Sequence, residues 1–175
     1  DDDDCATFIS FVKTKMASVA LQPKAKALMS RLTRDEALAI AAYTVEVPFA
    51  LYKWLNGWLM AARRDPVVQK HVGPYFALLF RALEKLEMMT TRAMRGVQVH
   101  NIPALLDTHT NYGTKCSAGA VISFWGIASF STKDDIPNNP AFVGPPGAPG
   151  IIYMCSALRC VSITPLSLVT GADEA

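Results

Sequence analysis

The sequence predicts an α+β protein, in which a helical first half packs on a β-core built from the second half. Residues 1 to about 90 contain few glycines and many Ala, Leu, Met and Lys residues, which favour helices. From residue 92 onward, short runs of β-branched and aromatic residues alternate with Pro and Gly. Helices followed by strands are typical of the α+β class. The 175 residues suit one domain, so we expect a single domain over 1–175.

A capping box predicts where one helix of the first half begins. Thr33 stands three residues before Glu36, so its hydroxyl can accept a hydrogen bond from the Glu36 amide while the carboxylate reaches back. Apolar residues then continue as far as Tyr43. We expect this helix to be interrupted by Pro48.

Helical spacing of apolar residues predicts further helices in the first half. One spans residues 49 to about 63, and a short one begins at Asp65–Pro66, with Asp65 as N-cap. We expect Gly73–Pro74 to break the chain and a last helix to run from residue 75 to about 88. The residues expected in the core on this basis are Trp54, Leu55, Phe76, Leu79 and Leu83.

Strand-forming runs predict the β part. We expect a short strand at residues 93–97, a run of strand formers at residues 120–131, and strands at residues 151–155 and 160–163. The Pro- and Gly-rich residues 138–150 are predicted to form a loop.

Composition excludes several classes of protein. A net charge of +2 without a basic stripe argues against a nucleic-acid partner. No run of about 18 uncharged apolar residues predicts a membrane span. No CxxC pair or histidine spacing predicts a metal site; the residues concerned are Cys5, Cys116, Cys155, Cys160, His71, His100 and His109. The four cysteines are compatible with free thiols and with a disulfide. The sequence does not indicate the cellular compartment.

Three short patches carry residues suited to binding a nucleotide. Arg95 next to Gly96 can present a planar fork of donors to a phosphate, and the glycine allows close approach. Ser129-Phe130-Ser131 offers hydroxyls for a ribose or an amide and a ring for stacking. Near the end of the sequence, Glu174 is a carboxylate that could stabilise positive charge developing on a sugar carbon.

Read in order, these patches resemble the Arg–Ser–Glu group of mono-ADP-ribosyltransferases. The helix from Leu32 to Thr44 is similar to the family's LTxEE…YT entry helix, and Met94-Arg95-Gly96-Val97 is similar to its Arg-Gly strand. Tyr52-Lys53-Trp54-Leu55-Asn56 resembles its YxxLN helix. Ser129-Phe130-Ser131 stands where the family has Ser-Thr-Ser. The resemblance covers residues 30 to 175.

The resemblance implies transfer of ADP-ribose from NAD to a protein side chain, with arginine as the expected acceptor and nicotinamide as the product. NAD is then a substrate, and no metal is expected. By the same resemblance, the catalytic residues are Arg95, Ser129 and Glu174. The residues that bind NAD are Arg95, Gly96, Ser129, Phe130 and Ser131.

The final motif departs from the family's Glu-x-Glu pattern. If Gly171 aligns with the glycine that precedes the motif, Ala172 stands at the first glutamate and Glu174 at the second. The apolar strand that follows in the family is missing, so we expect a domain truncated at its C-terminal end and very low transferase activity. The alternatives are a degenerate member that hydrolyses NAD, or one that only binds NAD or a protein.

Overall fold

The computed structural model describes all residues except 1, 47, 62–64, 99–125, 135–139 and 169–175. The chain forms two compact units. The first, here called the helical unit, comprises Asp1–Met88 together with Val161–Ala175, and the second, the sheet unit, comprises Met89–Cys160. The mixture of helices with a small antiparallel sheet confirms the α+β class.

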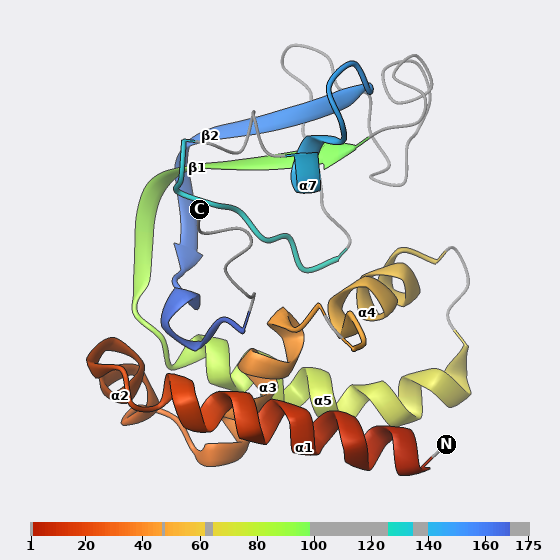
Figure 1. Cartoon of the computed structure of the whole chain (residues 1–175), viewed down its shortest axis with the longest axis vertical. Helices are drawn as coiled ribbons and strands as arrows, with labels where there is room; N and C mark the ends of the chain where they lie inside the picture. The colour runs from red at the N-terminus through yellow and green to blue at the C-terminus, as the bar shows by residue number, and fades with distance from the viewer. Residues whose placement is uncertain (1, 47, 62–64, 99–125, 135–139, 169–175) are drawn as a thin grey trace. The chain divides into compact units, whose positions relative to one another are not determined.

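The helical unit is built around α3, which packs against α1, α4 and α5 (Figure 1). The buried side chains of α3 include Ala37, Ala39 and Ile40, which lie on more than one side of the helix. A helix covered on several sides buries most of its surface, which is why α3 forms the core of this unit. The bounds of the helices are α1 (Asp2–Val19), α2 (Pro23–Met29), α3 (Arg34–Thr44), α4 (Leu51–Met60) and α5 (Pro66–Glu84).

The predicted capping box at the start of α3 is confirmed. The Glu36 amide donates to Thr33 Oγ1 at 3.2 Å, and the Thr33 amide donates to Glu36 Oε2 at 2.7 Å. Lys85, the C-cap residue of α5, donates from Nζ to both carboxylate oxygens of Glu36 at 2.6 and 2.8 Å. Glu36 is only 2% exposed, so this cap also joins the start of α3 to the end of α5.

The pH dependence of stability is expected to follow the Glu36 carboxyl. Its hydrogen bonds from Lys85, and then from the Thr33 amide, lower its pKa below the ordinary value of 4.5. A lowered pKa means that this stabilisation is complete above that value and is lost as the pH falls below it. We expect Glu36→Gln to lower the unfolding midpoint in urea at about pH 6 and to have a smaller effect at about pH 3.

The matched control is Glu84→Gln, which neutralises an exposed carboxylate near the end of α5. It is expected to change the midpoint little at either pH. An equal loss of stability for Glu36→Gln at the two pH values would contradict a link between ionisation of the Glu36 carboxyl and stability.

The start of α5 agrees with the sequence, but its predicted interruption is wrong. Asp65 caps the helix by accepting from the Val67 amide at 2.8 Å, with Pro66 in the first turn. The helix then continues through Pro74 to Glu84. Two physical reasons favour this outcome: the preceding glycine has no Cβ to clash with the proline ring, and the continuous helix keeps one apolar stripe in the core. That stripe consists of Val72, Phe76, Leu79 and Ala82.

The predicted core is confirmed in part. Leu55, Phe76 and Leu79 are buried, while Leu83 is half-buried. Trp54 is 46% exposed, so its predicted burial is wrong. Successive residues of a helix lie about 100° apart, and α4 directs Leu55 inward, which turns its neighbour Trp54 toward solvent.

Two antiparallel strands, β1 (Met88–Gln98) and β2 (Gly150–Val161), lie in the sheet unit, except for their end residues Met88 and Val161, which belong to the helical unit. β2 joins the two strands predicted at residues 151–155 and 160–163 into one, because residues 156–159 contain neither Pro nor Gly to end it. The predicted strand at 120–131 is corrected in its described part: residues 126–130 form no strand, and only Ser131 makes a β-bridge. Residues 120–125 lie outside the described residues.

After β2 the chain returns to the helical unit, whereas the sequence assigned all residues from 92 onward to the β part. The 3-10 helix η2 (Thr164–Leu166) packs against α1, α2 and α3. Leu166 is fully buried there. The helical unit is therefore completed by residues that are distant in sequence from its helices.

Candidate functional site

The Arg-Gly strand and the Ser-Phe-Ser segment lie side by side in the sheet unit. Met94 and Ser131 form an antiparallel bridge, each amide donating to the carbonyl of the other at 2.8 Å. Arg95 Nη1 also donates to the backbone oxygen of Ser129 at 2.8 Å. The structure thus brings together two patches that the family resemblance assigns to one site, although Ser129 itself lies in no strand.

The alternation of side chains along β1 decides which face of the strand carries Arg95. Successive side chains of a strand point to opposite faces, so Arg95 and its buried neighbour Met94 face in opposite directions. Arg95 and Gly96 are both half-buried. The backbone of the strand holds the base of the Arg95 side chain in place.

The guanidinium of Arg95 has donors that its contact with Ser129 does not use. Arginine offers five N–H donors in a fixed plane, and the contact with the Ser129 carbonyl occupies one of the Nη1 donors. Within the described part of the chain, Arg95 Nε is shielded from solvent and has no hydrogen-bond partner. The donors that remain for an anion are therefore those on the Nη atoms that the Ser129 contact does not use.

The Ser-Phe-Ser segment presents polar groups beside Arg95. Ser129 is exposed and Phe130 is half-buried. Ser131 Oγ accepts from the Lys133 amide at 3.0 Å, which fixes its side chain in a local turn. An exposed hydroxyl and a partly covered ring beside a guanidinium are groups that can contact a ribose and a planar base.

The third predicted patch is not described. Glu174 lies outside the described residues, as do Gly171 and Ala172, which set its register. Among the predicted catalytic residues, the structure therefore brings together Arg95 and Ser129. Of the histidines, His71 is exposed on α5, and the other two lie outside the described residues.

No known protein family, curated protein or solved structure matches this chain.

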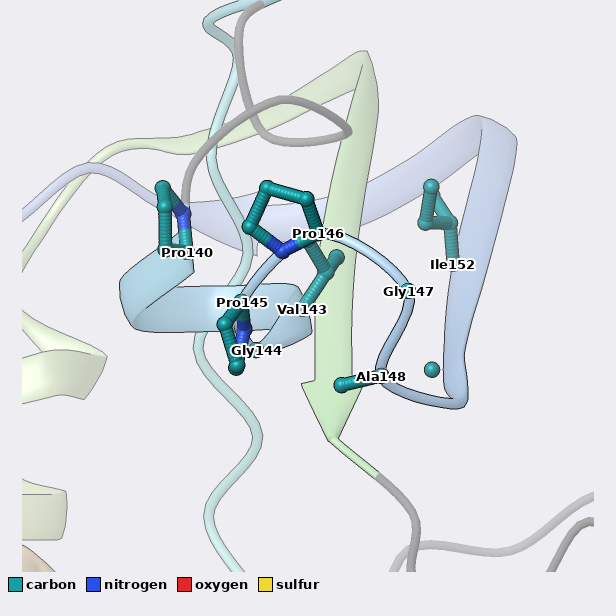
Figure 2. A pocket seen from close by; sticks show the side chains of 9 residues that line it. Pro140, Val143, Gly144, Pro145, Pro146, Gly147, Ala148 and Ile152 are labelled. Atoms are coloured by element: carbon teal, nitrogen blue, oxygen red, sulfur yellow. The ribbon is translucent and has the colours of Figure 1, made fainter.

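A pocket in the sheet unit was not anticipated from the sequence, which assigned residues 138–150 to a loop. The short helix α7 (Pro140–Val143), the following turn and the start of β2 border an open pocket of about 380 Å³ (Figure 2). The described residues that line it carry apolar side chains, with no acid, base or nucleophile among them. They are Pro140, Val143, Gly144, Pro145, Pro146, Gly147, Ala148, Gly150 and Ile152.

Glycine makes the turn beside this pocket possible. Gly147 has φ +87°, and the Ala148 amide donates to the Pro145 carbonyl at 2.9 Å. A positive φ after a proline is the geometry of a type II turn. At Gly150, an added Cβ would lie 2.9 Å from the Val143 carbonyl oxygen. The Pro/Gly pattern identifies such turns, but not the pocket that they border.

The described residues also bear on metal binding, membrane spanning and the cysteines. In the described residues, no three His, Cys, Asp or Glu side chains are grouped as a metal site would require. No described helix has the length and apolar character needed to span a membrane. Cys5, Cys155 and Cys160 are free thiols, and Cys116 lies outside the described residues.

Proposed function

We propose that this chain binds NAD and transfers its ADP-ribose to a protein side chain, with arginine as the acceptor. The observation that carries the proposal is the contact between Arg95 Nη1 and the Ser129 backbone oxygen at 2.8 Å. It supports a single binding surface made of the Arg-Gly strand and the Ser-Phe-Ser segment. The finer fold that we propose is a β-core of the ADP-ribosyltransferase type.

In this proposal, the guanidinium of Arg95 binds the phosphates of NAD, and Gly96 allows the ligand to approach the strand. The Ser129 hydroxyl supports the nicotinamide ribose, and Phe130 and Ser131 complete the surface. A planar fork suits this task because it matches the spacing of phosphate oxygens. The contact with Ser129 supports the assignment because it limits the orientations that the guanidinium can take.

The proposed reaction breaks the bond between C1′ of the ribose and the nicotinamide nitrogen. Nicotinamide leaves with the bonding electron pair, and positive charge develops on the ribose. A nitrogen of the acceptor arginine then forms the new bond to C1′ and loses a proton. Glu174 is proposed to stabilise the positive charge, as a carboxylate does in glycosyl transfer.

Hydrolysis of NAD is a second candidate because Ala172 stands at the position aligned with the first glutamate of the Glu-x-Glu motif. By resemblance to the family, that glutamate positions the acceptor arginine. An alanine cannot hold a guanidinium, whereas Glu174 could still assist the departure of nicotinamide. Water would then take the place of the acceptor.

The activity is tested by incubating the chain with labelled NAD and an arginine-rich acceptor protein. Released nicotinamide and label on the acceptor are measured separately. Both signals are expected under the transfer proposal, and nicotinamide alone under hydrolysis. Glu174→Gln should reduce nicotinamide release about a hundredfold, because it removes a charge placed at the reacting carbon. Unchanged release by this variant would exclude Glu174 as the catalytic residue.

NAD binding is expected to weaken about tenfold or more in Arg95→Lys, because an ammonium cannot replace a bidentate, charge-assisted contact. Isothermal titration with NAD measures this effect. Arg92→Lys is the matched control, because Arg92 is exposed on the same strand. Equal affinities for Arg95→Lys and the unchanged chain would reject the role of Arg95 and, with it, the proposed binding surface.

A further inference from the structure

A short turn joins α1 to α2 and holds an apolar side chain out in solvent. Leu21 is 84% exposed, although leucine is usually a buried residue. Backbone hydrogen bonds fix the turn: the Leu21 amide donates to the Ser18 carbonyl at 3.3 Å, and the Gln22 amide donates to the Val19 carbonyl at 3.0 Å. Leu21 is therefore presented at a defined place, at the end of α1 opposite the N-terminus (Figure 1).

The core of the helical unit holds both helices that flank this turn. Val12 and Met16 of α1 are buried, and so is Ala25 of α2. η2 packs against both helices. The exposed leucine thus projects from a packed part of the unit and not from a loose chain end.

The segment around the turn is basic. Residues 5–34 contain six of the 17 Lys and Arg residues of the chain and none of its 15 Asp and Glu residues. Four of the six are exposed on the two sides of the turn, and among the described residues they form no ion pair: Lys13, Lys15, Lys24 and Lys26. Lys24 follows Leu21 by three residues, so their Cα atoms are at most about 11 Å apart. Positive charge and an apolar side chain are therefore available at the same place.

This combination favours a lipid bilayer over other anionic partners. A bilayer with anionic lipids attracts the lysines and also offers an apolar region for the leucine. A nucleic acid would attract the lysines, but its bases need rings for stacking. No aromatic residue occurs between Phe11 and Tyr43, so the turn offers none.

We propose that this basic turn, made of Lys13, Lys15, Leu21, Lys24 and Lys26, docks on the surface of a bilayer that contains anionic lipids. Leu21 enters the boundary between headgroups and acyl chains. The long lysine side chains keep their ammonium groups among the lipid phosphates and carboxylates. The inference concerns attachment to a surface, and it does not depend on the proposed reaction with NAD.

The charge requirement is tested by sedimenting the full chain with vesicles of phosphatidylcholine, with or without about 30% phosphatidylserine. Binding is expected only with phosphatidylserine and should weaken about tenfold or more as salt rises from about 0.1 to 0.5 M. Replacing Lys24 and Lys26 together by glutamine should weaken binding about tenfold or more, because each basic residue near the surface contributes about fivefold. Replacing both by arginine should preserve binding. The matched control replaces Lys53 and Lys70, which are exposed on α4 and α5, by glutamine, and binding should change less than about twofold.

The role of the leucine is tested in the same vesicles. Leu21→Gln removes an apolar side chain and no charge, so binding is expected to weaken about fivefold or more. Val67→Gln is the matched control, because Val67 is 65% exposed on α5. All these side chains are exposed, so circular dichroism should show an unchanged fold in each variant.

Three outcomes would overturn the inference. Equal sedimentation with both kinds of vesicle would exclude recognition of anionic lipid. Equal losses for the two lysine pairs would show that net charge acts and not this turn. Unchanged vesicle binding by Leu21→Gln, with equally strong binding of the chain to single-stranded RNA or polyglutamate, would assign the turn to a soluble polyanion instead of a bilayer.

Discussion

Replacing Leu166 by alanine is expected to destabilise the helical unit by about 2–5 kcal/mol, the usual cost of emptying a fully buried leucine site. Leu166 has no exposed surface and lies in η2, which packs against three helices. The cavity would open between helices that hold each other in place, so little collapse is expected. The result would show that residues following the sheet unit are required for the stability of the helical unit.

Urea unfolding followed by circular dichroism at the helical wavelength measures this effect. Leu21→Ala is the matched control, because Leu21 is 84% exposed between α1 and α2. Surface substitutions of this kind usually change the free energy of unfolding by less than about 0.5 kcal/mol. Equal midpoints for Leu166→Ala and Leu21→Ala would show that η2 does not contribute to the core.

Replacing Pro74 by alanine is expected to stabilise the protein by about 1–3 kcal/mol. Proline in a helix interior costs about 3 kcal/mol relative to alanine, because it supplies no N–H to the carbonyl four residues earlier and its ring crowds that turn. Part of this gain is offset, since alanine raises the entropy of the unfolded chain by about 0.4–1 kcal/mol. Pro74 is exposed, so no packing is lost in the substitution.

Pro66→Ala is the control for the expected stabilisation by Pro74→Ala. Pro66 stands in the first turn of the same helix, where a backbone N–H would have no helical partner, and proline is tolerated there. Thermal unfolding should therefore show a higher Tm for Pro74→Ala and little gain for Pro66→Ala. A lower Tm for Pro74→Ala would mean that the chain requires proline at this position, as a helix boundary would.

Local chemistry made several elements predictable. The Thr33–Glu36 capping box and the Asp65 cap each depend on residues within three positions of one another, so the sequence contains the whole interaction. These two caps formed where the sequence placed them. The type II turn at Gly147 also depends on neighbouring residues, but the sequence predicted only a loop over residues 138–150.

Features that combine local preference with burial were predicted less well. Gly73–Pro74 is locally a helix breaker, but the apolar stripe of α5 outweighs that preference once Phe76 and Leu79 reach the core. For α4, helical spacing identified an apolar stripe, but it could not tell which edge of the stripe would be covered. Leu55 is buried and Trp54 is half exposed for that reason.

The candidate site shows the same division. The sequence by itself determined that an arginine-glycine pair and a serine-rich segment would be available, and which donors and acceptors each would offer. Only the tertiary structure decided that Arg95 and Ser129 would meet, and that Thr44 would contact Leu168 across 124 residues. Contacts between distant residues depend on how the whole chain packs, because the free energy that closes such long loops comes from the buried core and not from the residues that meet.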